Sequence, residues 1–272
     1  MEVLPMYKTY WGMEFNPFDK TIKESQYYQS EDYSAAIKRL EHLKNIKGIG
    51  LFTGLPGTGK TYTMKSFVHS LNPSLYKVIY LQMTTISNSE FYKVLAYGLG
   101  LEPCFKKIDN YRQIQERIIT LYKDQKVTLV IQIDEAQYLH KSILADLKLL
   151  MNFEMDSKDY AILILSGQPV LNSMLSMQIH EALKQRIVIN YNFQGLSTQE
   201  VKTYITSRME LSGVKQGIFE QNALEAVSGC CNGSIRKLNN LIHKSLMIGC
   251  EQKAQRITTE IIMDAQNEIE LL

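Results

Sequence analysis

The stretch Gly54-Leu55-Pro56-Gly57-Thr58-Gly59-Lys60-Thr61 fits the pattern G-x-x-x-x-G-K-[ST] at every fixed position. Glycines in this pattern let consecutive backbone N–H groups turn inward around phosphates, and the next helix points its positive N-terminal end at them. The pattern predicts that Lys60 reaches the β- and γ-phosphates of ATP and that Thr61 offers its hydroxyl to Mg²⁺. The residues that we expect to contact the nucleotide here are Gly54, Pro56, Gly57, Thr58, Gly59, Lys60, Thr61 and Tyr62.

Short apolar runs alternate with helical patterns on both sides of this loop. Strands are expected at 48–53, 76–81, 127–133, 161–165 and 187–191. Helices are expected at 34–43, 61–71, 90–99, 111–122 and around 174–184. Strand and helix in alternation imply a parallel sheet with right-handed crossovers. The expected fold class is α/β: a P-loop core with a five-stranded parallel sheet flanked by helices, followed by a small all-helical lid domain.

The pattern becomes purely helical from Ser197, with helices expected at 197–211, 219–227, 234–248 and 258–268. Ser197 and Glu200 have the spacing of a capping box, which marks the start of the first of these helices. We therefore expect three parts: an N-terminal strap near the nucleotide (1–30), an α/β nucleotide-binding domain (31–195) and a helical lid domain (196–272).

The N-terminal strap carries several aromatic residues around a proline turn, between Tyr10 and Phe18. Two interpretations stay open. The segment packs over the protein core, or it closes over the adenine, whose flat ring needs apolar and aromatic walls. On the second interpretation Pro17 and Phe18 contact the nucleotide.

Composition excludes several classes of protein. The formal net charge is only +2, so a nucleic-acid surface would have to come from local clustering of charge. The four cysteines lack C-x-x-C spacing and the five histidines are scattered, which favours reduced thiols rather than a disulfide framework or a Cys/His metal site. The chain shows neither a signal-peptide h-region nor an apolar run of about 18 residues. We expect a cytoplasmic protein that makes no membrane contact.

Two acidic residues follow the apolar run 127–133. Asp134 and Glu135 come at the carboxyl end of this strand, where ligands of open α/β sheets bind. Asp134 is expected to hold Mg²⁺, mostly through water. Glu135 is expected to orient and polarise the water that attacks the γ-phosphate. Together with the P-loop, this pair predicts a Mg²⁺-dependent ATPase.

Three further polar residues are candidates for contact with the phosphates. Gln168 follows the strand 161–165 and is favoured over Ser166 as the side chain that touches the γ-phosphate or its water, with an ordinary turn as the alternative. Arg186 lies at a strand edge, where it faces a neighbouring subunit or forms a surface ion pair. Arg236 lies in the first turn of a helix, within reach of phosphate oxygens.

With these motifs in place, the chain resembles an AAA+ ATPase of the ExeA/GspA-like family, which is similar to the transposition regulators TnsC, MuB and IstB. The likeness covers nearly the whole chain. It is carried by the P-loop and by Tyr10-Trp11-Gly12, Asn16-Pro17-Phe18, Asp134-Glu135-Ala136-Gln137, Ser166-Gly167-Gln168-Pro169, Leu183-Lys184-Gln185-Arg186-Ile187, Tyr204-Ile205-Thr206-Ser207-Arg208 and Gly233-Ser234-Ile235-Arg236.

The resemblance assigns roles to four residues. It implies that Gln168 is sensor 1, that Arg186 is an arginine finger acting in trans, and that Arg236 is sensor 2. It makes Gln82 a candidate for coupling DNA occupancy to Glu135, a position where Asn is commoner. It also implies a homo-oligomer, as a hexameric ring or a helical filament, in which hydrolysis is stimulated by assembly and by DNA.

The resemblance leaves two biological roles open. Secretion-type members extend through a membrane segment into a periplasmic part, and the printed chain stops at Leu272 without either. We therefore expect a regulator that assembles with ATP on duplex DNA, presents target DNA to a DDE transposase, and disassembles on hydrolysis. The alternative is an ATPase that energises assembly of a secretion or envelope complex without DNA.

The resemblance implies that DNA contacts come from two loops, 84–89 and 106–111. Lysine contacts to phosphates there would give affinity that is largely independent of sequence. Two solvated loops are the alternative. The candidate DNA-binding residues are Thr85, Asn88, Lys106, Lys107 and Arg112.

Overall fold

The computed structural model describes residues 6–19, 28–82, 85–154, 157–214 and 216–270. The chain divides into two compact units. One, the sheet unit, contains residues 35–54 and 60–193. The other, the helical unit, contains the N-terminal residues to 34, the P-loop residues 55–59 and the chain from 194 onward.

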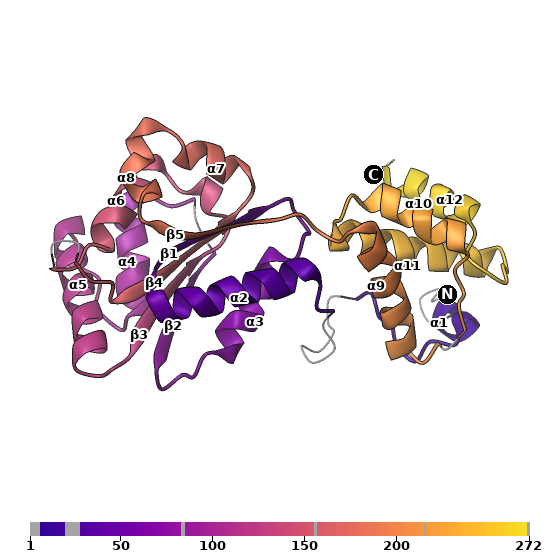
Figure 1. Cartoon of the computed structure of the whole chain (residues 1–272), viewed down its shortest axis with the longest axis horizontal. Helices are drawn as coiled ribbons and strands as arrows, with labels where there is room; N and C mark the ends of the chain where they lie inside the picture. Colours follow the sequence, from indigo (N-terminus) through magenta and orange to yellow (C-terminus); the bar gives the residue numbers. More distant parts are fainter. Residues whose placement is uncertain (1–5, 20–27, 83–84, 155–156, 215, 271–272) are drawn as a thin grey trace. The chain divides into compact units, whose positions relative to one another are not determined.

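The sheet unit is built on five parallel strands: β1 Gly48–Gly54, β2 Tyr76–Leu81, β3 Thr128–Ile133, β4 Ala161–Gly167 and β5 Ile187–Phe193. Their order is β2-β3-β4-β1-β5, which confirms the predicted fold class (Figure 1). In the register, Phe52 pairs with Ser166 and Ile133 pairs with Leu165. The carboxyl ends of β1, β4 and β3 therefore lie side by side.

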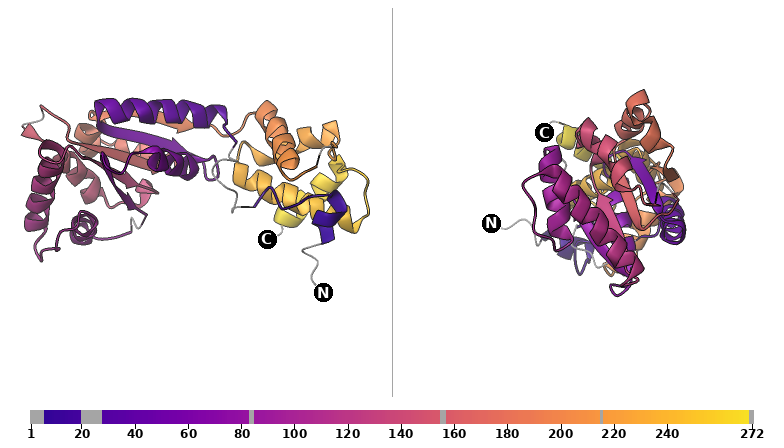
Figure 2. Two further views of the ribbon diagram at one scale, coloured as in Figure 1. Left: turned by 90° about the horizontal axis from the view of Figure 1, so that it is seen from below. Right: turned by 90° about the vertical axis from the view of Figure 1, so that its left-hand side faces the viewer.

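Helices cover both faces of this sheet (Figures 1 and 2). One face packs on α2 Glu31–Ile46 and α3 Lys60–Ser70. The other packs on α4 Asn88–Gly98, α5 Lys107–Lys123, α6 Lys141–Leu150, α7 Val170–Leu175 and α8 Glu181–Lys184. The 3-10 turn η4 Gln178–His180 contacts α6 and α8. Successive strand residues point to opposite faces, so Leu129 and Ile131 join the second layer while Val130 joins the first. Burial on both faces explains the continuous apolar runs.

The structure corrects three local predictions. Residues 106–109, predicted as a loop, contain the start of α5, because the Lys106 carbonyl accepts the N–H groups of Asp109 and Asn110. The loop 84–89 also ends early, since Ser87 caps α4, while Thr84 lies outside the described residues. The helix expected at 174–184 is interrupted because Met177 is extended, with φ −67° and ψ 142°. Two helices, α1 Met6–Trp11 and α6, were not predicted.

The helical unit contains α1, α9 Thr198–Leu211, α10 Gln221–Cys231, α11 Ile235–Glu251 and α12 Thr259–Glu270 around one apolar core. The four predicted C-terminal helices are confirmed, and the capping box of α9 is formed by Ser197 and Glu200. Trp11 joins this core, and its Nε1 donates to the Leu246 carbonyl at 2.9 Å. The exposed Tyr10 donates its OH to the Ala254 carbonyl at 2.8 Å. Among the described residues, no helix is long and apolar enough to span a membrane.

Two glycines of the helical unit make a matched test of this packing. Gly195 has φ +88°, and an added Cβ would lie 2.4 Å from the Gly233 carbonyl oxygen. Gly195→Ala should lower the free energy of unfolding by at least about 1–2 kcal/mol, since it adds left-handed strain to a backbone clash. Gly229 lies on the exposed side of α10 with open space around it, so Gly229→Ala should raise stability by roughly 0.5–1 kcal/mol. Urea unfolding measures both; a neutral Gly195→Ala would contradict the clash.

Candidate functional site

Asp134 lies at the carboxyl end of β3 and is only 4% exposed. Its Oδ2 accepts hydrogen bonds from Thr61 Oγ1 at 3.0 Å and from Tyr80 OH at 3.2 Å. Its Oδ1 accepts from Ser166 Oγ at 2.7 Å and from the Glu135 N–H at 3.0 Å. The structure thus brings together Thr61 and Asp134, the two residues predicted to hold Mg²⁺.

These two side chains suit a magnesium ion. A hydroxyl and a carboxylate are hard oxygen ligands, and Mg²⁺ is commonly bound by one or two protein oxygens, with water and substrate phosphates completing its shell. Within the described part of the chain there is no group of three or more His, Cys, Asp or Glu side chains that could hold a metal alone. The donor set therefore fits an ion that arrives with a phosphate ligand.

Lys60 begins α3 at the end of the P-loop. Its ammonium group is buried, and Nζ donates to the Gly54 carbonyl at 2.7 Å. The P-loop glycines Gly57 and Gly59 have φ of +83° and +99°, conformations that L side chains rarely adopt. The local backbone therefore requires glycine where the sequence pattern has it.

Glu135 follows Asp134 in a left-handed conformation, with φ 50° and ψ 41°, and caps the 3-10 turn η2 Ala136–Tyr138. Its Oε2 accepts a hydrogen bond from Gln137 Nε2 at 2.5 Å. The other end of the same amide, Gln137 Oε1, accepts the backbone N–H of Gln168 at 3.0 Å. Gln137 therefore connects the predicted catalytic carboxylate to the segment that follows β4.

Of the two polar residues after β4, it is Ser166 that contacts Asp134, and its side chain is fully buried. Gln168 is half-buried and takes part through its backbone N–H. Its role as sensor 1 stays a prediction. Tyr80 and Gln137 were not predicted as site residues, and Ser166 was considered but ranked below Gln168. Sheet register is the signal that finds Tyr80 and Ser166, because each lies beside the carboxyl end of β3.

Arg236 lies in the first turn of α11, within the helical unit. There the Ile235 N–H donates to the Gly57 carbonyl at 2.9 Å, and Ser234 Oγ donates to the Pro56 carbonyl at 3.2 Å. A Cβ added at Gly57 would lie 2.9 Å from the Arg236 Cβ. The structure thus brings this exposed arginine next to P-loop residues, and its sensor 2 role remains a prediction.

Arg186 lies between α8 and β5 and is half-buried. Its Nη1 donates to the Lys148 carbonyl in the last turn of α6 at 3.1 Å. A guanidinium is favourable at a helix C-terminus, where carbonyl groups lack helical partners. This contact gives Arg186 a role within its own chain, and the arginine-finger role stays a prediction.

Three further predicted residues, Gln82, Pro17 and Phe18, have other surroundings. Gln82 is exposed at the end of β2, where Tyr80 rather than Gln82 bonds to the acidic pair. Phe18 is buried in the core of the helical unit, with its ring centroid 6.4 Å from that of Tyr204. The preceding residue, Pro17, is also buried. These are the contacts of a strap over the core. Contact between this segment and adenine stays a prediction.

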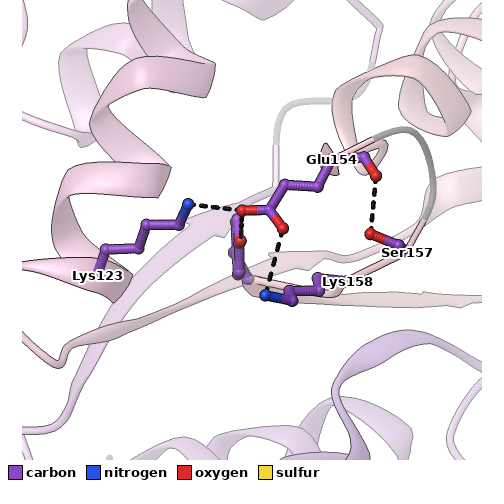
Figure 3. Close-up of polar contacts among 5 residues, drawn as sticks. Lys123, Glu154, Ser157 and Lys158 are labelled. Atoms are coloured by element: carbon purple, nitrogen blue, oxygen red, sulfur yellow. Dashed lines mark hydrogen bonds and ion pairs between the residues drawn. The ribbon is translucent and has the colours of Figure 1, made fainter.

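A second polar region lies at the opposite, amino-terminal edge of the sheet. A cleft of about 610 Å³ there is lined by Tyr122, Lys123, Lys126, Lys158, Asp159 and Tyr160. Figure 3 shows the Glu154 carboxylate between Lys123 and Lys158, at 2.5 and 3.3 Å. The hydrogen bond from Lys123, then that from Tyr160, lowers the pKa of Glu154 to about 2. These ion pairs connect α5 to the segment before β4, at the opposite edge of the sheet from Asp134.

Comparison with known proteins shows what part of the chain is similar to them. Residues 44–175 match the family model described as AAA domain. The expected resemblance to the ExeA/GspA-like family is supported by one relative of that kind, and the resemblance to TnsC, MuB and IstB stays a prediction. The general secretion pathway protein A of Aeromonas hydrophila is 28% identical over 97% of this chain and 48% of that protein. The chain thus spans about half the length of this relative.

Solved structures share the AAA+ fold at low identity. Cdc6p from Pyrobaculum aerophilum matches with a TM-score of 0.68 and 13% identity, over 93% of this chain and 70% of that one. The Aeropyrum pernix ORC2 protein matches at 0.65 and 15%, over 94% and 72%. The Thermotoga maritima RuvB Holliday junction branch migration motor matches at 0.56 and 18%, over 95% and 72%. These likenesses establish the fold.

The hydrogen bond between Tyr80 and Asp134 can be tested by titrating the Tyr80 hydroxyl. Burial first, then the charge and hydrogen bond of Asp134, raise the pKa of Tyr80 from 10.0 to about 12. Because the pKa of Tyr80 is higher in the folded state than in the unfolded state, this residue stabilises the folded state below pH 10. Its contribution to the free energy of unfolding is lost as the pH rises towards 12. Asp134→Asn should lower the pKa of Tyr80 but leave it above 10, since burial is the larger cause.

The tyrosine titration is followed by NMR of ¹³Cζ-labelled protein, with Tyr80→Phe to assign the signal. Tyr92 provides an internal control, because its raised pKa comes from burial and from Asp146 rather than Asp134. A Tyr80 titration that is the same in wild type and Asp134→Asn would disprove the contact.

Proposed function

We propose that this protein is a Mg²⁺-dependent ATPase that hydrolyses ATP to ADP and phosphate. The observation that supports this most is the hydrogen bond between Thr61 and Asp134, because it joins the end of a complete P-loop to the acidic pair after β3. A degenerate nucleotide-binding scaffold would have no need to keep Lys60, Thr61, Asp134 and Glu135 together.

Each residue has a proposed task in the reaction. Lys60 binds the β- and γ-phosphates in place of the Gly54 carbonyl, and Thr61 and Asp134 hold the ion. When bound, Mg²⁺ neutralises charge on the phosphate oxygens. Glu135 accepts a proton from the water whose oxygen bonds to the γ-phosphorus, while the bond from that phosphorus to the β,γ-bridging oxygen breaks.

For the biological role we propose assembly of a secretion or envelope complex in the cytoplasm. The similarity to general secretion pathway protein A supports this role, since it extends over 97% of this chain. The transposition role expected from the chain's end at Leu272 has no such support. Because this chain spans about half of that relative, the position of its last residue is no evidence for either biological role.

Assembly into a homo-oligomer is part of the proposal. An arginine finger supplied in trans is worth about 10³–10⁵ in rate, so a lone subunit would hydrolyse ATP slowly. Arg186 would have to leave the Lys148 carbonyl to act on a neighbour's nucleotide.

The ATPase proposal predicts that one substitution slows hydrolysis without weakening ATP binding, and that another weakens ATP binding itself. Glu135→Gln should bind ATP with near wild-type affinity and lose about 10²–10⁴-fold in kcat, because the amide cannot accept the water's proton. Lys60→Ala should lose ATP affinity itself. Both are measured by phosphate release and by binding of a fluorescent non-hydrolysable ATP analogue, with thermal unfolding as the control for folding. Wild-type kcat in Glu135→Gln would disprove the assigned base.

A second candidate function, ATP-dependent DNA binding, is favoured by one observation on the sheet unit. Thr85, Lys106 and Arg112 are exposed near the starts of α4 and α5, where the resemblance places DNA contacts. Asn88 is half-buried, and Lys107 forms an ion pair with Asp146. The candidate surface therefore reduces to Thr85, Lys106 and Arg112.

The two roles are separated by fluorescence anisotropy of a labelled random-sequence duplex, titrated with protein and a non-hydrolysable ATP analogue at several salt concentrations. The secretion role predicts no binding beyond that seen with ADP. Cooperative, salt-sensitive binding that requires the ATP analogue would instead establish the DNA role. In that case, replacing Lys106 and Arg112 by Ala should reduce the salt slope by roughly two, and Lys184→Ala, an exposed lysine of α8, should leave it unchanged.

A further inference from the structure

The amide of Gln137 occupies a constrained position between two parts of the site. The side chain is 9% exposed, and both ends of its amide form hydrogen bonds. Nε2 donates to a carboxylate oxygen of Glu135 at 2.5 Å, and Oε1 accepts the Gln168 N–H at 3.0 Å. The chemistry of the partners fixes this orientation, because a carboxylate needs a donor and an N–H needs an acceptor.

A glycine makes room for this side chain. Gly167 ends β4, and a Cβ added there would lie 2.4 Å from Gln137 Oε1 and 3.4 Å from the Ala136 N–H nitrogen. The φ of Gly167 is not in the left-handed region, so its backbone conformation alone does not require glycine. An added Cβ at this position would instead displace the Gln137 amide.

We propose that Gln137 is the positioning residue for Glu135, and that it fixes the direction of the Glu135 carboxylate relative to the end of β4. The inference rests on the proposed ATPase function. Glu135 extends from a left-handed residue outside β3, so its strand does not fix the carboxylate direction. Gln137 supplies that constraint from η2 and links it to the backbone of Gln168, the residue expected to sense the γ-phosphate. A movement of the segment after β4 is thereby transmitted to the base.

The test uses three variants that perturb the amide differently. Gln137→Leu removes both hydrogen bonds. Gln137→Glu keeps the volume and the acceptor for Gln168 but cannot donate to Glu135. Gly167→Ala keeps Gln137 and displaces its amide. Tyr138→Ala, on the same turn but with a side chain 56% exposed, is the matched control.

We expect all three variants to lower kcat on the order of 10²-fold, because a misplaced catalytic group loses its alignment with the reacting water. The KM for ATP and the affinity for a non-hydrolysable analogue should change less than about twofold. A space-filling role for Gln137 predicts instead that Gln137→Leu, which fills a similar volume and adds no charge, keeps wild-type kcat. Thermal unfolding checks that each variant folds.

Failure of this inference can be told apart from failure of the proposed function. If the wild type hydrolyses ATP and Glu135→Gln does not, the ATPase stands, and wild-type kcat in Gln137→Glu then overturns the positioning role alone. If the wild type shows no more hydrolysis than Lys60→Ala under any condition, the proposed function fails and the inference fails with it. An equal loss of kcat in Tyr138→Ala would also overturn it, since the effect would then belong to the turn.

Discussion

The sheet unit depends on one buried carboxylate. Removing an ionised group from water is costly unless hydrogen bonds replace its hydration, and Asp134 meets this requirement with donors from four segments. Thr61 comes from α3, Tyr80 from β2, Ser166 from β4, and the Glu135 N–H from the turn after β3. The same contacts that make Asp134 tolerable in the interior bring the end of the P-loop to the acidic pair.

Much of this arrangement could be predicted from the sequence because it follows from local rules. The apolar runs of β1, β3 and β4 are buried on both faces, so their composition locates them, and the P-loop pattern specifies its own backbone. Residues such as Ser166 and Tyr80 could not be found in this way. Their role depends on which strands are neighbours, and β1 pairs with β4 and β5 rather than with the next strand along the chain.

The errors have a common physical cause. The start of α5 was missed because Asn110, a poor helix former, satisfies its amide on the backbone of Cys104 and Lys106, which gives the first turn its stability. The contacts of the aromatic strap could not be predicted for a similar reason, because an indole packs equally well against adenine or against helices. The bond from Trp11 to the Leu246 carbonyl is a tertiary contact that composition does not reveal.

The two acidic residues are held by different kinds of contact. Asp134 accepts hydrogen bonds from four segments of the sheet unit. The Glu135 carboxylate accepts a hydrogen bond from the Gln137 amide, which is itself bonded to the backbone of the segment after β4. The proposed tasks differ in the same way, because a magnesium ligand needs a fixed direction, whereas a base that acts only when a γ-phosphate is present needs to respond to its surroundings. An amide side chain between Glu135 and the β4 segment allows that response without displacing the buried carboxylate beside it.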